Sequence, residues 1–235
     1  FDANGISVPT TWDELNAAAE KLKAAGIIPF AHGGQAWQDA TVFEAVAMGL
    51  GGNNYYKNCY VDLKESCLRS ETTVKVFDQM RKLQSYTDEG SPGRDWNVAT
   101  GMVIEGKAGF QIMGDWAKGE FTAAGKVPGV DYYCAATPSN NGYLYNVDSF
   151  IFYKSSDPDK QAGQQLLAKL MMGKNFQKVF NLYKGSIPAR LDVSMDEFDK
   201  CAKTSNADIK TAGAKGGLVP SFAHGMAQGN TMKAA

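Results

Sequence analysis

The sequence has few of the residues and motifs that usually mark an enzyme or a metal protein. Its 235 residues include only two histidines and four cysteines. There is no CxxC pair, no histidine at metal-ligand spacing from a cysteine, and no HExxH pattern. A GxSxG elbow, a Walker loop and a GxGxxG turn are missing as well. We therefore expect no metal, no cofactor and no enzyme, although a glycosidase-like pair of acidic residues remains open because acids are numerous.

An excess of charge of one sign and long apolar runs are also missing. The net charge is −1, with acids and bases interspersed, so the sequence predicts no nucleic-acid partner. No stretch approaches the ~20 consecutive apolar residues of a membrane helix. There is no initiator methionine and no signal peptide, and neither end resembles a natural domain end. We expect a processed or truncated chain, incomplete at both ends.

The four cysteines allow two interpretations. Their separations favour Cys59 with Cys67 across a short loop, and Cys134 with Cys201, which an oxidising export compartment would turn into disulfides. Alternatively, all four are small buried apolar residues. Composition alone does not choose between the two.

Helical and extended patterns alternate along the chain, which predicts an α/β fold. The clearest helix has a capping box formed by Thr11 and Glu14, and its core stripe includes Trp12. The predicted helices are 11–25, 39–50, 70–86, 97–105, 117–125, 158–172, 174–184 and further helices from 195 onward. The predicted strands are 27–32, 108–113, 131–138 and 147–154, with loops at 51–58 and 139–146. Leu166, Leu167, Leu170 and Met171 are expected to pack inward.

Two tryptophans are predicted to lie at the ends of elements, where binding residues concentrate. Trp96 precedes the helix at 97–105, and Trp116 follows the strand at 108–113. In open α/β sheets, ligands bind beyond the carboxyl ends of strands, which is the predicted position of Trp116. Gly114 is expected to let the chain turn so that the Trp116 indole points toward a ligand.

A scattered set of polar and aromatic residues shares this position near element ends. Aromatic faces and charged hydrogen-bonding groups together suit a sugar, which has an apolar CH face and a rim of hydroxyls. The candidate ligand-binding residues are Trp96, Trp116, Asn146, Asp148, Lys184 and His224.

Each candidate also has a structural interpretation. The two tryptophans could be half-buried loop anchors, which spacing alone slightly favours, and Asn146 and Asp148 could cap turns. Lys184 lies in the last turn of a helix, where the dipole favours a cation. A lone loop histidine such as His224 is more often structural, and His32 we interpret as structural.

Several stretches resemble one family. "GISVPTTWDELNAAAEKLKAAGIIPFAHGG", "GKAGFQIMGDWAKGEF" and "DKQAGQQLLAKLMMGKNFQKVFNLYKGSIPAR" are similar to extracellular solute-binding proteins of ABC sugar transporters, of the maltose-binding type. "HGGQAWQDATVFEAV", "GRDW" and "VPSFAHGMA" favour the subgroup of periplasmic glucose/mannose-binding proteins of Gram-negative bacteria. The resemblance covers nearly the whole chain.

The resemblance implies a two-lobed α/β fold with a hinge and a central cleft. It also implies that the two tryptophans stack on the sugar, and that Asp148, Lys184, His224 and, less directly, Asn146 bond its hydroxyls. The implied protein is a periplasmic receptor that closes on a monosaccharide (glucose, or mannose or galactose) and delivers it to a membrane permease. We expect a monomer.

On the family pattern, residues 1–144 form most of one lobe, 145–190 belong to the other, and 191–235 return to the first. Members of the family are longer than this chain, so segments of both lobes are expected beyond it. Two other functions stay open, a glycoside-processing enzyme and a carbohydrate-binding module without a transporter.

Overall fold

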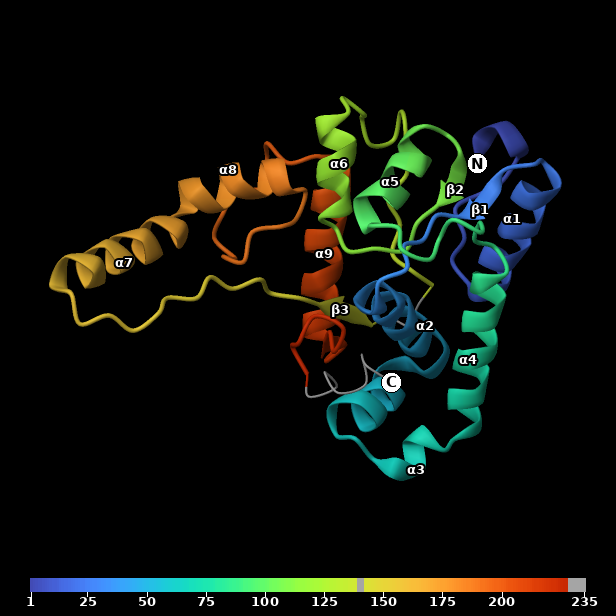
Figure 1. Cartoon of the computed structure of the whole chain (residues 1–235), viewed down its shortest axis with the longest axis horizontal. Helices are drawn as coiled ribbons and strands as arrows, with labels where there is room; N and C mark the ends of the chain where they lie inside the picture. The colour runs from blue at the N-terminus through green and yellow to red at the C-terminus, as the bar shows by residue number, and fades with distance from the viewer. Residues whose placement is uncertain (139–141, 228–235) are drawn as a thin grey trace.

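The computed structural model describes residues 1–138 and 142–227. Helices and short parallel strands alternate, as the sequence predicts (Figure 1). The helical elements are η1 (Asp2–Asn4), α1 (Trp12–Ala24), α2 (Ala36–Tyr56), the π-turn η2 (Lys57–Val61), α3 (Glu65–Leu68), α4 (Glu71–Gln84), α5 (Trp96–Ile104), α6 (Ala117–Ala123), α7 (Pro158–Met171), α8 (Lys174–Lys184) and α9 (Lys200–Ala214). The strands are β1 (Ile28–Phe30), β2 (Ala108–Phe110), β3 (Tyr143–Tyr145) and β4 (Leu218–Pro220).

Helix α1 begins where the sequence predicts. The Thr11 hydroxyl accepts from the Glu14 backbone N–H at 3.2 Å, and the Glu14 carboxylate accepts from the Thr11 N–H at 3.3 Å. This reciprocal pair satisfies two N–H groups that the first helical turn leaves free. Trp12 follows at 6 % exposure and belongs to the main core, as predicted.

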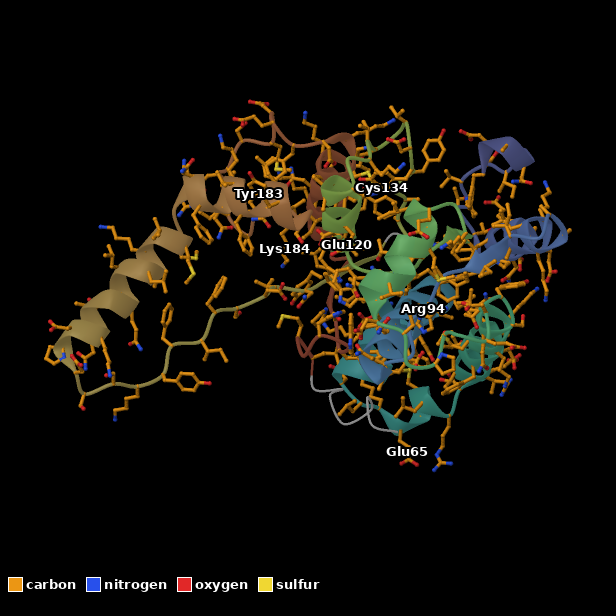
Figure 2. The ribbon with its side chains drawn as sticks, turned by 45° about the horizontal axis from the view of Figure 1, so that its top comes forward. Glu65, Arg94, Glu120, Cys134, Tyr183 and Lys184 are labelled. Atoms are coloured by element: carbon orange, nitrogen blue, oxygen red, sulfur yellow. A yellow bond between two sulfur atoms is a disulfide. The ribbon has the colours of Figure 1, made fainter. Side chains whose placement is uncertain are left out.

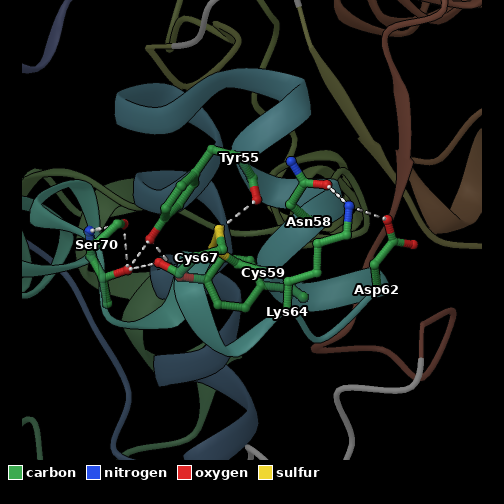
Figure 3. Close-up of a disulfide and its surroundings, with 9 residues drawn as sticks. Tyr55, Asn58, Cys59, Asp62, Lys64, Cys67 and Ser70 are labelled. Atoms are coloured by element: carbon green, nitrogen blue, oxygen red, sulfur yellow. Dashed lines mark hydrogen bonds and ion pairs between the residues drawn. A yellow bond between two sulfur atoms is a disulfide. The ribbon is translucent and has the colours of Figure 1, made fainter.

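Helix α2 is longer than predicted, because aromatic burial outweighs its glycines. The expected loop at 51–58 is helical apart from Gly52, whose φ of 73° bends the helix, and it continues into η2. Tyr56 and Tyr60 in this region are fully buried. The Cys59–Cys67 disulfide then ties η2 to α3 (Figure 3).

Both predicted disulfides are present. Cys59–Cys67 closes a short loop, whereas Cys134–Cys201 joins positions 67 residues apart and fastens the segment before β3 to α9. The alternative of four reduced cysteines is therefore wrong. The second bridge removes far more freedom from the unfolded chain than the first.

The strands form two parallel pairs. β1 pairs with β2 in the register Ile28↔Ala108, and β3 pairs with β4 in the register Tyr143↔Leu218 to Tyr145↔Pro220. The largest core cluster brings α1, α2 and α4 together with β1 and the segment after β4. Because strands are parallel within each pair, their carboxyl ends open to the same side.

Two strand predictions are wrong. Within 131–138 only Tyr132 pairs, through an isolated bridge to Pro128, and 147–154 contains no strand. The side chains of Ile151 and Tyr153 are 80 % and 81 % exposed. Residues of high β-propensity form a strand only beside a partner edge, and the described chain gives 147–154 none. β3 instead forms inside the predicted loop at 139–146, of which 139–141 lie outside the described residues.

Residues 147–184 project from the rest of the molecule (Figure 1). We call them the arm and the remaining described residues the body. Leu166, Leu167 and Leu170 of α7 are 69 %, 46 % and 59 % exposed, and only Met171 is buried. The predicted inward packing of this stripe is therefore wrong for three of its four members, because the described chain provides no surface against it.

Candidate functional site

The candidate site is built on the carboxyl ends of all four strands. Trp37 follows β1 in the first turn of α2, and Trp116 follows β2 as the N-cap of α6. Asp148 follows β3, and His224 follows the neighbouring β4. This is the position at which open α/β sheets bind ligands. Segments that are far apart in sequence thus supply one set of side chains.

Three aromatic rings form the centre of the set. The Trp116 ring centroid lies 4.9 Å from that of His224, in an edge-to-face arrangement. Trp37 lies 6.5 Å from Trp116 and 6.0 Å from His224. A Cβ added at Gly114 would overlap the Trp116 indole, so glycine is what allows the ring to fold back over its own turn. The three rings offer an apolar surface next to polar groups.

Trp37 is a residue that the sequence prediction missed. Its indole N–H donates to the Gln35 side-chain oxygen at 2.7 Å, and the Gln35 amide donates to Asp95 at 2.6 Å. These bonds fasten the start of α2 to the start of α5. The signal was present in the sequence, since Trp37 follows a predicted strand just as Trp116 does.

Trp96 is the first residue of α5, not a loop residue before it. Its position at the start of α5 places it at the same rim as Trp37, through the Gln35–Asp95 bond. Within residues 1–138 and 142–227 no ring contact joins Trp96 to Trp116 or His224. The structure therefore groups two of the predicted aromatic residues, Trp116 and His224, and leaves Trp96 beside the group.

Asp148 and Lys184 form an ion pair at the root of the arm. They stand at opposite ends of its sequence, and Asn146 donates to Asp148 at 3.0 Å. The Lys184 ammonium, which donates to Asp148, lowers the pKa of that carboxyl, with smaller contributions from Asn146 and His224. Four predicted residues, Asn146, Asp148, Lys184 and His224, are therefore electrostatic neighbours.

Close backbone packing sets the position of Lys184. It is the last residue of α8, where Gly185 adopts a left-handed φ of 91° and ends the helix. A Cβ at Gly119 of α6 would meet the Lys184 carbonyl at 2.7 Å, so α8 ends directly against α6 (Figure 2). The Ser186 hydroxyl then donates to Asp115 at 2.8 Å. Close backbone packing at Gly119 and Gly185 therefore fixes the position of the Lys184 backbone.

Other groups in the described part of the chain do not form a metal site. No cluster of three histidine, cysteine, aspartate or glutamate side chains is placed to hold an ion there. His32 lies 2.7 Å from Asp39 and is 9 % exposed, which agrees with its predicted structural role. Among the described helices, none is both long and apolar enough to span a bilayer.

Comparison with known proteins identifies the family of this chain. The model of the bacterial extracellular solute-binding protein family matches residues 1–171. The chain belongs to this family. Two probable sugar-binding periplasmic proteins are similar to this solute-binding chain, one from Brucella suis at 48 % identity and one from Rhizobium meliloti at 47 %. Each match covers 99 % of the chain, and 55 % and 56 % of the respective relative.

A solved structure confirms the fold class. The chain superimposes on a Streptococcus pneumoniae solute-binding protein, described in complex with the blood group A-trisaccharide, with a TM-score of 0.70. The two are 19 % identical, and the match covers 99 % of this chain and 59 % of that one. The solute-binding chain thus spans little more than half the length of the proteins it matches.

Proposed function

We propose that the full-length protein is a periplasmic sugar-binding receptor of an ABC transporter, and that it captures a hexose such as glucose, mannose or galactose. The observation that carries this proposal is the position of the Trp37, Trp116 and His224 rings beside the Asp148–Lys184 ion pair. Family membership and the names of the two relatives support it.

The chemistry of the site suits a pyranose better than an anion or an apolar ligand. An indole face stacks on the CH face of a sugar ring, while Asp148 accepts from hydroxyls and Lys184 donates to them. Each hydrogen bond to a charged group contributes about 1.5–3 kcal/mol. The Asn146 amide and the His224 imidazole add partners for further hydroxyls. Trp96, at the neighbouring helix start in the same lobe, is proposed as a second stacking ring at the edge of the site.

The proposed lobe division keeps the predicted boundaries. Residues 1–144 and 191–235 belong to one lobe, and 145–190 belong to the other, whose remainder lies outside this chain. The exposed leucines of α7 support this division, because they are the apolar face that such a remainder would cover. Closure of the two lobes would surround the sugar, and the closed form would dock on a membrane permease.

Isothermal titration of the full-length protein tests the proposal. D-glucose, D-mannose, D-galactose and maltose would be compared with an amino acid and with inorganic phosphate. We expect saturable heat with at least one hexose and none with the last two ligands. Heat only with the amino acid or phosphate would contradict the proposal. Turnover of a chromogenic glycoside would instead favour the glycoside-processing enzyme.

A further inference from the structure

A buried carboxylate lies beneath His224. Glu44 of α2 is 3 % exposed. Its Oε1 accepts from the Ser221 hydroxyl at 2.6 Å, and its Oε2 accepts from the Ala223 backbone N–H at 3.3 Å. Oε2 also lies 3.0 Å from the Tyr56 hydroxyl, whose single proton is shared with the Pro220 carbonyl at 3.0 Å. A buried carboxylate requires such donors, because it loses its hydration on folding. All three come from residues around α2 and the segment after β4.

The Ser221 hydroxyl has a single proton, which it donates in a hydrogen bond to Glu44. A carboxylate only accepts hydrogen bonds, so the 2.6 Å contact requires Ser221 to be the donor. The Ser221 oxygen is then left with lone pairs alone. It accepts from the His224 backbone N–H at 3.2 Å, and it faces the His224 Nδ1 at 2.8 Å. The proton in that second contact must therefore lie on Nδ1.

The other ring nitrogen follows from this assignment. A neutral imidazole carries one proton, so with Nδ1 protonated the Nε2 atom is an acceptor. Nε2 of His224 is buried, with no hydrogen-bond partner among residues 1–138 and 142–227. The rings of Trp116 and Trp37 pack against the His224 imidazole. A ligand group that contacts Nε2 must therefore donate a hydrogen bond to it.

We propose that Glu44, through Ser221, fixes His224 in the Nδ1–H tautomer, so that Nε2 accepts a hydrogen bond from one hydroxyl of the bound sugar. This inference rests on the proposed function for its ligand. Glu44 and Ser221 are positioning residues, and they do not touch the sugar. Their effect is to make the site select a hydroxyl that can donate at one position.

The second histidine of the chain provides an internal reference. His32 Nε2 lies 2.7 Å from the Asp39 carboxylate, which only accepts, so Nε2 of His32 carries the proton. The two histidines are thus assigned opposite tautomers. Charged groups near His224 are Glu44, whose Oε1 is 3.7 Å from Nδ1, and the Asp148–Lys184 pair.

Nitrogen-15 NMR of the two imidazoles in the full-length protein tests the assignment without any sugar. At a pH where both rings are neutral, we expect a pyrrole-type Nδ1 and a pyridine-type Nε2 for His224, and a pyrrole-type Nε2 for His32. The imidazole signals that disappear in His224→Asn belong to His224, and the remaining set belongs to His32. A pyridine-type Nδ1 in His224 at that pH would overturn the proposal.

Glu44→Gln tests whether the carboxylate sets the tautomer. The Ala223 N–H continues to donate toward the Oε2 position, so the amide oxygen goes there and the NH₂ group faces Ser221. Ser221 then donates to His224 Nδ1, and the proton moves to Nε2. We expect the His224 pattern to invert while His32 is unchanged. Glu71→Gln, at an exposed glutamate of α4, is the matched control, and an unchanged His224 pattern in a folded Glu44→Gln protein would refute the relay.

Monodeoxyfluoro hexoses test whether a sugar hydroxyl donates to Nε2, since fluorine cannot donate a hydrogen bond. One analogue should bind the parent protein about tenfold more weakly than the unmodified sugar, as expected for loss of one buried hydrogen bond. In Glu44→Gln, the same analogue should bind less than about threefold more weakly than the unmodified sugar. Equal losses of affinity in both proteins for every analogue would contradict the proposed hydrogen bond to Nε2. Absence of any hexose binding would refute the proposed function and leave the NMR result to decide the tautomer.

Discussion

Helices α4 and α7 have nearly the same local design and opposite surroundings. Each has 14 residues and begins at a side-chain cap, Ser70 in one and Asp157 in the other. In the body, α4 buries Leu83 at 1 % exposure. In the arm, α7 leaves Leu166 at 69 %.

This difference teaches that periodicity identifies the apolar face of a helix and not the surface that covers it. Two open apolar hollows, of about 510 and 480 Å³, lie along α7 and α8, one around Phe180 and the other around Leu170. The arm therefore resembles half of an interface, whereas Leu83 of α4 is packed in the core of the body.

The largest expected effect contrasts two leucine truncations. In the 235-residue chain, Leu83→Ala should lower the free energy of unfolding by about 2–5 kcal/mol, because it leaves a cavity in the core. Leu166→Ala should change it by less than about 0.5 kcal/mol, because the side chain is already exposed. Denaturant unfolding measures both.

The same pair sharpens the comparison in the full-length protein. If a second lobe covers α7, Leu166→Ala should there become destabilising by more than about 1 kcal/mol. An effect below about 0.5 kcal/mol in both proteins would show that the arm remains uncovered.

Removing the Cys134–Cys201 bridge should destabilise the chain more than removing Cys59–Cys67, because its closed loop of 67 residues includes the whole arm. Chain-entropy arithmetic gives about 4 kcal/mol for the Cys134–Cys201 bridge and about 2.5 kcal/mol for Cys59–Cys67. Double Cys→Ala variants of each pair, compared by urea midpoint, measure the ranking. Thiol titration of the unfolded, unreduced protein should find no more than two free thiols. Four free thiols would show that the bridges do not form.

Gly114→Ala should displace the Trp116 indole, since the added Cβ overlaps the ring. We expect a loss of about 1–3 kcal/mol in hexose affinity, comparable to a stacking contact with its buried area. Gly101→Ala is the control, because nothing lies within 4 Å of the added Cβ there. It should leave affinity unchanged and slightly stabilise α5. Equal affinity in the two variants would mean that the ring position does not matter for binding.

The smallest effect concerns acid at the root of the arm. Lys184 lowers the folded-state pKa of Asp148 below its ordinary value of 3.8. The stability from this pair is complete above about pH 4 and is lost as the pH falls through the lowered pKa. Because Asp148 is 58 % exposed, the loss should stay below about 1 kcal/mol. The free energy of unfolding is measured against pH for the parent chain and for Asp148→Asn, and the difference isolates the contribution of the pair. Identical pH profiles would show that the pair contributes nothing.

Local features of the fold could be predicted from the sequence, and long-range pairing could not. The capping box at Thr11, the α8 stop at Gly185 and the buried Trp12 depend on neighbouring residues, and all are confirmed. The strand predicted at 147–154 failed, and β3 with its partner β4 was missed, because strand formation depends on a partner 75 residues away, as Tyr143↔Leu218 shows. Sequence periodicity contains no information about that partner.

The candidate site divides in the same way. The rule that ligands lie beyond strand ends pointed to Trp116, and the structure places His224 and the Asp148–Lys184 pair near it. Trp37 was missed, although the same rule applied to it. Glu44 could not have been found from sequence, because its role depends on contact with Ser221, 177 positions away. The assignment of Trp96 to the ligand stays a prediction.

The central claim is that Trp116 serves the ligand and not the core, and a single comparison tests it most directly. In the full-length protein, the hexose affinity and the denaturation midpoint without sugar are measured for Trp116→Ala, with Trp12→Ala as the core control. We predict a binding loss of about 2–4 kcal/mol with a nearly unchanged midpoint for Trp116→Ala. Trp12→Ala should instead lose about 3–5 kcal/mol of stability. A Trp116→Ala protein that unfolds early yet binds hexose normally when folded would contradict the claim.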